Sequence, residues 1–536
     1  MLLYAMVFAP FLAALLMVAA SGKDAKSAAR LAVIFAALIF TAGIPLLVLE
    51  GDLFPVEWFT IPWVDVTVTF SFAVDGVSAW MVFLANIITL AALISARKTQ
   101  GGNYRNFAIG MFALQGALNG TFLAKDAVLF FFFFEALVLP AAILIGSYGG
   151  QERRAAAINF SLYTLIGSAP MAVALWYLIC LAGSSHIAAI SAVAQNLPDK
   201  EQAILFWCFA LAFWVKTPLF PLHGWQAQTY AEAPAGLSAV LTGSMSKAGV
   251  YGFLVWVLPV FPAVAQKNAT CFLWIGLFTA VYGALMAMRA KDIKKLLAFS
   301  SMGHLGLAVA GVFTLSDSMT PAVLVLLVGH GLSASALFIL AGSAERFAGH
   351  RLLEKMGGFS GQHPVFAFFF GTASVLAIAI PGTAGFVGEF LVLLELWNVS
   401  AVAAVVSGVC IVLTGVYMLM LIQKVLFGQA KELSEEQKKL RFPVSEALAT
   451  APLLILLLVF GICPSAITNS VDGSYQEAQK EEELEAAIAA AAASEELLTE
   501  DSTEVVLEIN TEAVDSANAL PESIPEVKQV EAENVR

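Results

Sequence analysis

Residues 130–146 read FFFFFEALVLPAAILIG and hold one acidic residue, Glu135, inside an otherwise apolar run. Uninterrupted apolar segments of this kind are typical of membrane-spanning helices. An acidic side chain at the centre of a bilayer costs roughly 2.5 to 3.5 kcal/mol on insertion scales. We therefore expect Glu135 to face the interior of a helix bundle and to have a function there.

The whole chain has the composition of a membrane protein. Of its 536 residues, 59% are hydrophobic and only 13% are charged, whereas a soluble domain has about 25% charged residues. We expect an all-α polytopic membrane protein with about fourteen transmembrane helices. The candidate helices lie near residues 2–20, 31–49, 77–96, 107–124, 127–148, 158–182, 203–222, 236–261, 271–288, 295–314, 321–343, 364–394, 401–427 and 445–463.

The net charge of −12 is concentrated at the C-terminus. Residues 472–536 contain 18 acidic and 3 basic residues, and the rest of the chain carries a net charge of +3. An acidic, low-complexity segment that is nearly free of aromatic residues cannot bury enough apolar surface to fold alone. We expect a solvated, disordered tail that makes few contacts with the helices.

No motif for a cofactor, metal ion or nucleic acid is present. The five cysteines are scattered over separate helices without CxxC spacing, which argues against iron–sulfur and zinc sites. The nucleotide-binding GxGxxG and Walker patterns are also missing. We expect no cofactor and no metal on this chain, and any electron transfer would need other subunits.

Lysine and arginine mark the cytoplasmic side of membrane proteins. The loops after the first, third, fifth, ninth, eleventh and thirteenth helices carry 20 basic residues with their flanks, and the opposite loops carry three. The prediction is a multi-pass protein of the inner (cytoplasmic) membrane with both termini on the outer, periplasmic side.

Six ionisable side chains are expected at membrane depth, each in a different helix. Taken singly, a Lys–Glu pair can be a structural clamp, and a lone histidine is more often a satisfied core residue. Six together, of both signs, favour a proton or ion relay, because neighbouring groups of this kind titrate as coupled sites. They are Glu135, Lys216, Lys247, His304, His330 and Glu389.

Two of the helices are expected to be broken, the seventh at Pro218 and Pro221 and the twelfth at Pro381 and Gly382. Interrupted helices in corresponding positions suggest internal repeats with ion sites at the breaks. The breaks are five helices apart, so helices 4–8 and 9–13 would be two inverted repeats, although their sequences show no visible similarity.

The corresponding division of the chain has five parts. They are the first three helices (1–106), the first repeat (107–262), the second repeat (263–428), a loop with the last helix (429–467) and the acidic tail (468–536).

Motifs in eight helices resemble one known family. The stretches FFFFFEALVLPAAILIG, KTPLFPLHGW, AEAPAGLSAVL, SKAGVYG, KDIKKLLAFSSMGHLG, GHGLSASALFILAG and IPGTAGFVGEF are similar to the antiporter-like membrane subunits of respiratory complex I, NADH:quinone oxidoreductase. The resemblance covers roughly residues 70–430. It implies fourteen helices with two inverted five-helix repeats, and proton translocation. Relatives occur in Mrp-type Na⁺/H⁺ antiporters and membrane-bound hydrogenases.

The resemblance also assigns roles. It implies proton translocation through Glu135, its partner Lys216, the central Lys247, the histidines and Glu389. A glutamate at position 389 is the mark of the M type, because the L and N types carry a lysine there. The chain would then be a subunit of an oxidoreductase without redox chemistry of its own. Its partners would be L-like and N-like antiporter subunits, the peripheral redox arm and the lipid bilayer.

One loop departs from the family pattern. After the seventh helix the family reads close to HGWLPDAHxEAP, and this chain has Gln226, Gln228 and Tyr230 where Leu, Asp and His are expected. This difference affects the usual proton entrance. Two other functions stay open: a subunit of an Mrp-type antiporter or a membrane-bound hydrogenase, and a non-conducting membrane scaffold.

Overall fold

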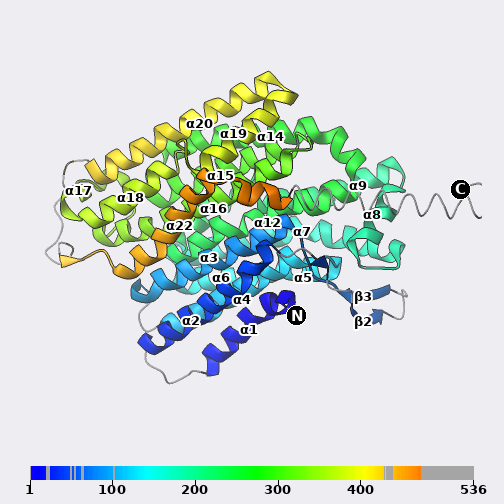
Figure 1. The fold of residues 1–536 in the computed structure, drawn as a ribbon, viewed down its shortest axis with the longest axis horizontal. Helices are drawn as coiled ribbons and strands as arrows, with labels where there is room; N and C mark the ends of the chain where they lie inside the picture. Colours follow the sequence, from blue (N-terminus) through cyan, green and yellow to red (C-terminus); the bar gives the residue numbers. More distant parts are fainter. Residues whose placement is uncertain are drawn as a thin grey trace, which may run out of the picture. The chain divides into compact units, whose positions relative to one another are not determined.

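The structure is a computed structural model of the chain (Figure 1). It describes residues 2–19, 25–48, 51–52, 56–61, 66–99, 103–427, 429, 437 and 439–471. The acidic tail beyond residue 471 lies outside the described residues, so the expectation of few tail contacts stays a prediction.

The α-helices follow one another through the described part of the chain. They are α1 (Leu2–Ala19), α2 (Ala25–Gly43), α3 (Gly76–Thr99), α4 (Tyr104–Leu123), α5 (Ala127–Ala136), α6 (Val138–Tyr148), α7 (Arg153–Ala182), α8 (Ile187–Gln195), α9 (Asp199–Lys216), α10 (Gln226–Glu232), α11 (Ala235–Val240), α12 (Lys247–Gly252), α13 (Leu258–Val260), α14 (Pro262–Arg289), α15 (Ile293–Val312), α16 (Met319–Ala348), α17 (Phe359–Gln362), α18 (Pro364–Leu376), α19 (Ala384–Val399), α20 (Ala401–Ile422) and α22 (Val444–Ile462). Short 3₁₀ turns cover Ile44–Leu47 and Leu353–Lys355, and π-helical turns cover Leu241–Met245, Phe253–Val257 and Gln423–Phe427.

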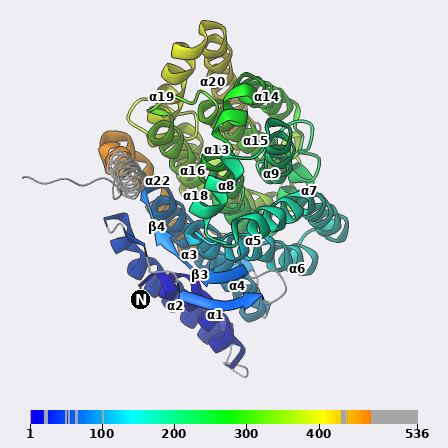
Figure 2. The same ribbon diagram turned by 90° about the vertical axis from the view of Figure 1, so that its right-hand side faces the viewer.

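The predicted all-α membrane fold is confirmed, and each of the fourteen predicted spans coincides with a helix or a run of helices. In the described residues, ten helical segments are long and apolar enough to cross a membrane. The remaining four predicted spans are α4, α9, the run from α11 to α13, and the pair α18 and α19. The first two helices lie at one edge of the bundle and α19 and α20 at the opposite edge (Figures 1 and 2).

The helix α16 lies at the centre of the bundle, because an apolar stretch of 18 residues in this helix is completely buried inside the protein. In contrast, many large apolar side chains on α1, α7 and α20 are exposed. An apolar outer surface is what a helix bundle in lipid requires, because lipid chains replace water as the surrounding solvent. The interior can therefore carry the polar residues.

The inverted repeats are visible as a constant offset of 166 residues. Both α7 and α16 have 30 residues, and each ends at a glycine with positive φ, Gly183 (φ 63°) and Gly349 (φ 74°). Isolated antiparallel bridges also recur, Asp126 with His186 and Asp292 with Leu352. Equivalent elements of the two repeats are five membrane spans apart. Because five is an odd number, the two copies run in opposite directions through the membrane.

The N-termini of α5 and α15 are capped in the same way. The Oδ1 atom of Asp126 accepts from the backbone N–H groups of Val128 (2.8 Å) and Leu129 (3.0 Å). Oδ1 of Asp292 accepts from those of Lys294 (2.8 Å) and Lys295 (3.2 Å). An aspartate at this position supplies an acceptor for the unpaired N–H groups of a first helical turn.

Both expected helix breaks are present. The helix α9 ends at Lys216, and a turn leads from Thr217 to α10. The twelfth span is interrupted between α18 and α19, and Thr383 caps the start of α19. The 166-residue offset relates Thr217 to Thr383, so the two breaks lie at equivalent positions of the repeats.

Short strands occur in the connection between α2 and α3, where the sequence predicted none. They form two antiparallel pairs, β1 (Gly51–Asp52) with β4 (Ala73–Val74) and β2 (Val56–Ile61) with β3 (Val66–Phe70). The alternating, β-branched VTVTF sequence of β3 favours this conformation. Figure 2 shows β3 beside the N-terminal helices.

Candidate functional site

Lys247 lies at the centre of the protein, in a helix with irregular geometry. Lys247 is 0% exposed and lies between the π-helical turns Leu241–Met245 and Phe253–Val257. Its Nζ atom donates a hydrogen bond to the backbone oxygen of Thr242 (2.5 Å). π-Helical turns inside α-helices are frequent at functional sites, and here the irregular turn offers a carbonyl oxygen to the ammonium group.

A pair of hydroxyl groups extends this contact to the next helices. The Thr242 hydroxyl donates to Oγ of Ser301 on α15 (2.8 Å). Oγ of Ser301 in turn lies 3.1 Å from Nε2 of His330 on α16. Thr242 and Ser301 are both 0% exposed. Two hydroxyls, each able to donate and accept, therefore lead from Thr242 to His330, and Lys247 contacts the same threonine at its backbone oxygen.

The two histidines stack face to face. The ring centroids of His304 and His330 lie 4.6 Å apart, and the ring planes differ by 14°. Two imidazolium rings at this separation would repel each other, because a nearby like charge disfavours the charged form. The pair is therefore suited to hold one proton at a time.

The proton arrangement of His304 follows from its partners. Nδ1 lies 2.8 Å from the backbone oxygen of Ser300, and Nε2 lies 3.1 Å from Oε1 of Glu389. A carbonyl oxygen can only accept, so Nδ1 carries a hydrogen. A carboxylate can also only accept, so the second contact needs one more proton, on Nε2 or on Glu389. The His304–Glu389 pair thus holds one mobile proton.

Glu389 ends this chain beside a small cavity. The residue is 3% exposed, and its Oε2 atom has no hydrogen-bond partner. A cavity lined by His304, Glu389, Thr414 and Tyr417 leaves about 10 Å³ for the centre of a water molecule, which is about the space that one water needs. The unpartnered oxygen and the cavity together make a site where one water can meet the carboxyl group.

The first repeat holds Lys216 in a different setting. Lys216 is the last residue of α9, is 2% exposed, and its Nζ atom has no hydrogen-bond partner. The Nζ atom lies 4.5 Å from the centroid of the Phe134 ring, within the range of a cation–π contact. Lys216 therefore stands next to the non-helical break, as the sequence predicted, without a direct anionic partner.

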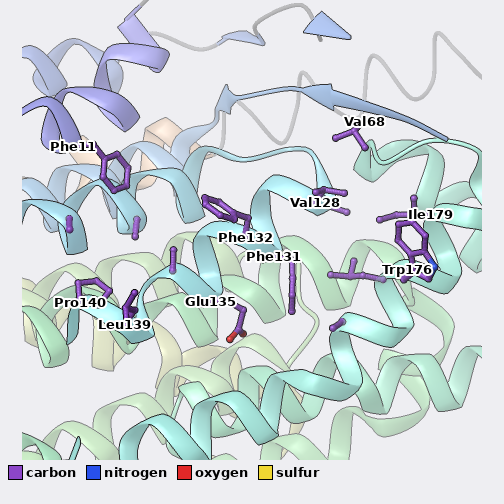
Figure 3. Close-up of a pocket in the computed structure, with 16 residues that line it drawn as sticks. Phe11, Val68, Val128, Phe131, Phe132, Glu135, Leu139, Pro140, Trp176 and Ile179 are labelled. Carbon is purple, nitrogen blue, oxygen red and sulfur yellow. The ribbon is translucent and has the colours of Figure 1, made fainter. Parts of the chain in front are cut away.

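Glu135 is close enough for its charge to act on Lys216, but no ion pair within 4.0 Å joins them. Glu135 lines an apolar groove of about 910 Å³ between α4, α5, α6 and α7. It is the only charged residue among the groove-lining side chains in Figure 3. Glu135 is half-buried, and exposed residues such as Phe132 and Leu139 line the same groove, so the expectation that Glu135 faces the bundle interior is met only in part.

The six predicted residues fall into two groups. Hydrogen bonds and ring stacking join Lys247, His330, His304 and Glu389 into one chain. No hydrogen bond extends this chain to Lys216 or Glu135 in the part of the protein that the structure describes. The structure therefore brings four of the six residues close together, but among the described residues no hydrogen bond joins Lys247 to a hydroxyl or His330 to His304, so the continuous axis stays a prediction.

Sequence reasoning missed the hydroxyl groups that link the chain. They are Thr242, Ser300, Ser301 and Tyr417, and the Tyr417 hydroxyl lies 2.8 Å from Oγ of Ser300. The paired serines of FSSMGH, one helical turn before His304, were the available signal.

The divergent loop after α9 is tightly packed. Gln226 is 0% exposed, and neither its amide nitrogen nor its amide oxygen has a partner. The Tyr230 hydroxyl donates to the backbone oxygen of Leu241 (3.1 Å), at the start of the π-helical turn before Lys247. Tyr230 also lies beside Gln226 and Ser246. Tyr230, which stands where the family has His, therefore contacts the turn that precedes Lys247.

The chain is similar to membrane subunits of respiratory complexes in sequence. Residues 124–415 match the family model described as NADH:quinone oxidoreductase/Mrp antiporter, transmembrane. The NADH-quinone oxidoreductase subunit M of Rickettsia typhi is 33% identical over 410 residues, which cover 76% of this chain and 82% of the relative. The subunit M of Escherichia coli K12 is 31% identical over 429 residues, with coverage of 77% and 83%.

Solved structures agree with this similarity. A chain of respiratory complex I from Thermus thermophilus matches with a TM-score of 0.79 and 27% identity, over 89% of this chain and 99% of that chain. A chain of the Mrp complex from Dietzia matches with a TM-score of 0.76 over 88% of this chain and 96% of that one, but at 18% identity. At that identity, the second likeness concerns the fold alone.

Proposed function

The chain belongs to the NADH:quinone oxidoreductase/Mrp antiporter family of membrane proteins, and on that premise we propose that it is the M-type proton-translocating subunit of an NADH:quinone oxidoreductase. The observation that carries the proposal is the series of neighbouring polar residues from Lys247 to Glu389 at the centre of the bundle. Its last member is a glutamate, which the M-type relatives lead us to expect.

The proton steps use groups that lie close together. Lys247 loads a proton, and its ammonium turns from the Thr242 backbone oxygen to the Thr242 hydroxyl, so that the Thr242 and Ser301 hydroxyls can pass a proton to His330. The stacked rings of His304 and His330 favour a single positive charge on the pair. A proton that arrives at His330 therefore drives the transfer of the proton on His304 to Glu389. Each hydroxyl gives one proton and receives another, which requires only rotation of an O–H group.

Lys216 and Glu135 are proposed to control loading. A buried ammonium without a hydrogen-bond partner is costly, so the charge of Lys216 depends on the nearby carboxylate. Glu135 is reached from the groove between α4, α5, α6 and α7. An adjacent subunit that occupies this groove could change the charge or position of Glu135 and thereby the proton affinity of Lys216.

The electron chemistry is assigned to partners. The cysteines lack the spacing for a cluster, so we propose a peripheral redox arm, together with L-like and N-like membrane subunits, as the assembly in which the chain works. The basic loops favour the inner membrane as the location and the periplasmic side for both termini. An Mrp-type antiporter subunit is the second candidate, since the same family contains both.

The test is the variant Lys247→Ala, studied in the assembled complex in membrane vesicles with NADH oxidation and proton uptake measured together. Proton uptake should be lost or should fall together with NADH oxidation. The matched control is Lys267→Ala, because Lys267 is 62% exposed and pairs with Asp199 at the surface. An assembled Lys247→Ala complex that pumps like the wild type would contradict the proposal and favour the scaffold. A requirement for Na⁺ without NADH oxidation would favour the antiporter.

A further inference from the structure

Glu395 is a second buried carboxylate on α19. The residue is 7% exposed and stands six positions after Glu389. With a rise of 1.5 Å per residue, this places it about 9 Å further along the helix axis. Val392 and Leu396 are buried on the same helix, so Glu395 belongs to the stripe of α19 that faces the bundle.

Among the described residues, the Glu395 side chain receives one hydrogen bond, and it comes from the connection between α15 and α16. The Ser316 hydroxyl donates to Oε2 of Glu395 (2.5 Å), and Oγ1 of Thr314 lies 3.2 Å from Oγ of Ser316. Asp317, the next residue in this connection, is exposed. Glu395 therefore lies close to the protein surface, and Ser316 holds its carboxyl group in place there.

The connection lies at the membrane side opposite the basic loops. The helix α15 begins beside Lys294 and Lys295 and ends at Val312, immediately before the connection. Because basic loops mark the cytoplasmic side, the surface near Ser316 is the outer one. Glu395 thus lies between the centre of the membrane and the side to which protons would be released.

An apolar contact separates the two carboxyl groups. Val392, which is 0% exposed, packs against Gly311 of α15. A Cβ atom at position 311 would lie only 3.1 Å from Cγ1 of Val392, so the glycine is what allows this close approach. Close packing here excludes water between Glu389 and Glu395.

We propose that Glu395 is the proton-release group that receives the proton from Glu389 and gives it to the outer side. The proposal rests on the proposed function. When the contact between Val392 and Gly311 opens, protonated Glu389 donates its proton through a water that enters there, which leaves Glu389 as a carboxylate and Glu395 as a carboxylic acid. Glu395 then loses the proton to water at the surface near Ser316 and returns to the carboxylate.

A purely structural role for Glu395 makes different predictions. In that role its carboxylate only holds the connection between α15 and α16 against α19 through the hydrogen bond from Ser316. In Glu395→Gln the side-chain oxygen can still accept from Ser316, but the group can no longer carry a proton. In Ser316→Ala the tie is removed and the acid remains. The two variants therefore separate proton release from clamping.

The experiment compares both variants, Glu395→Asp and Lys247→Ala in the assembled complex in vesicles. The release role predicts that Glu395→Gln slows proton uptake on the order of tenfold or more, while Ser316→Ala pumps nearly normally and Glu395→Asp recovers most activity. Wild-type uptake in Glu395→Gln, or loss of uptake in Ser316→Ala, would overturn it. If Glu395→Gln does not assemble, Ser316→Ala decides by the same criterion.

The parallel Lys247→Ala variant separates this inference from the proposed function. If Lys247→Ala stops uptake and Glu395→Gln does not change it, only the release role of Glu395 fails. If neither changes uptake, the proposed function fails, and the release role fails with it.

Discussion

His304 Nε2 lies 3.1 Å from Glu389 Oε1, and this contact requires one proton that neither the Ser300 carbonyl nor the carboxylate can supply. The pair is therefore a proton-holding site by its geometry. Because Glu389 has a second oxygen without a partner beside a cavity, the proton can also leave on the side away from the histidine.

Glu389→Gln should keep the contact with Nε2 of His304 but lose the mobile proton that this pair holds. A glutamine amide can donate N–H to Nε2 of a neutral His304, so the helices should still pack while the pair no longer stores a mobile proton. We expect assembly to remain normal and proton uptake to fall on the order of tenfold or more. Infrared difference spectra should lose one carboxyl band.

The matched control for this change is Glu354→Gln, because Glu354 is exposed in the loop after α16. Wild-type uptake in Glu389→Gln would contradict the proton-holding role. Continued pumping in Glu389→Lys, the residue type of the L and N relatives, would show that the acid is not required at this position.

Ser301→Ala should interrupt transfer without unfolding the protein. Ser301 is the only hydroxyl that contacts both Thr242 and His330 among the described residues. Losing a neutral hydrogen bond costs about 0.5 to 1.5 kcal/mol, so the complex should assemble, but proton uptake should fall. The control is Ser407→Ala, because Ser407 is equally buried and its hydroxyl has no partner. Equal uptake in the two variants would remove Ser301 from the pathway.

The hydroxyl relay shows where sequence reasoning reaches its limit. Serines and threonines in membrane helices often bond to the carbonyl four residues earlier in their own helix, as Thr164 does with Phe160. Thr242 and Ser301 instead meet across two helices, and Thr242 lies within the π-helical turn Leu241–Met245. The ionisable residues could be found by type alone, but this crossing needs the three-dimensional fold.

The inverted repeats had a weak signal in the sequence. The tripeptide Ala-Lys-Asp occurs at 124–126 and at 290–292, with the same 166-residue offset as Gly183 and Gly349. Those residues cap helices or turn the chain, which requires particular side chains. Most other repeat positions need only to be apolar, so their identities have diverged and the overall similarity is hidden.

The pair Asp75 and Lys125 should make stability depend on pH. Burial opposes ionisation of Asp75, but the charge and hydrogen bond of Lys125 and the hydrogen bonds of Ser78 outweigh it and lower the pKa of Asp75. The stabilisation is then present above the unfolded pKa of about 3.9 and is lost as the pH falls through the lower folded pKa. Asp75→Asn should lower the melting temperature near neutral pH, and the difference should vanish in acid.

The control for the Asp75 experiment is Asp199→Asn. Asp199 also pairs with a lysine, at 2.6 Å, but its side chain is 84% exposed, and such surface pairs contribute little to stability. A loss of stability in Asp199→Asn equal to that in Asp75→Asn would show that burial of the pair is not what matters.

Substituting both Glu135 and Lys216 should restore part of the stability that Glu135→Gln loses, but should not restore proton pumping. The ammonium of Lys216 has no hydrogen-bond partner, so its charge is supported mainly by Glu135 from beyond 4.0 Å. Two unit charges about 6 Å apart interact by about 3 kcal/mol at an effective dielectric constant of 20. Glu135→Gln should therefore lower the thermal stability of the assembled complex, whereas Glu135→Gln combined with Lys216→Met should recover part of it, because no unpaired charge remains. Proton uptake should be impaired in all the variants, since none can load Lys216 normally.

If the double variant is less stable than Glu135→Gln alone, the two residues do not act as a pair. If the double variant pumps normally, loading of Lys247 is independent of the first repeat, and the proton path begins at Lys247.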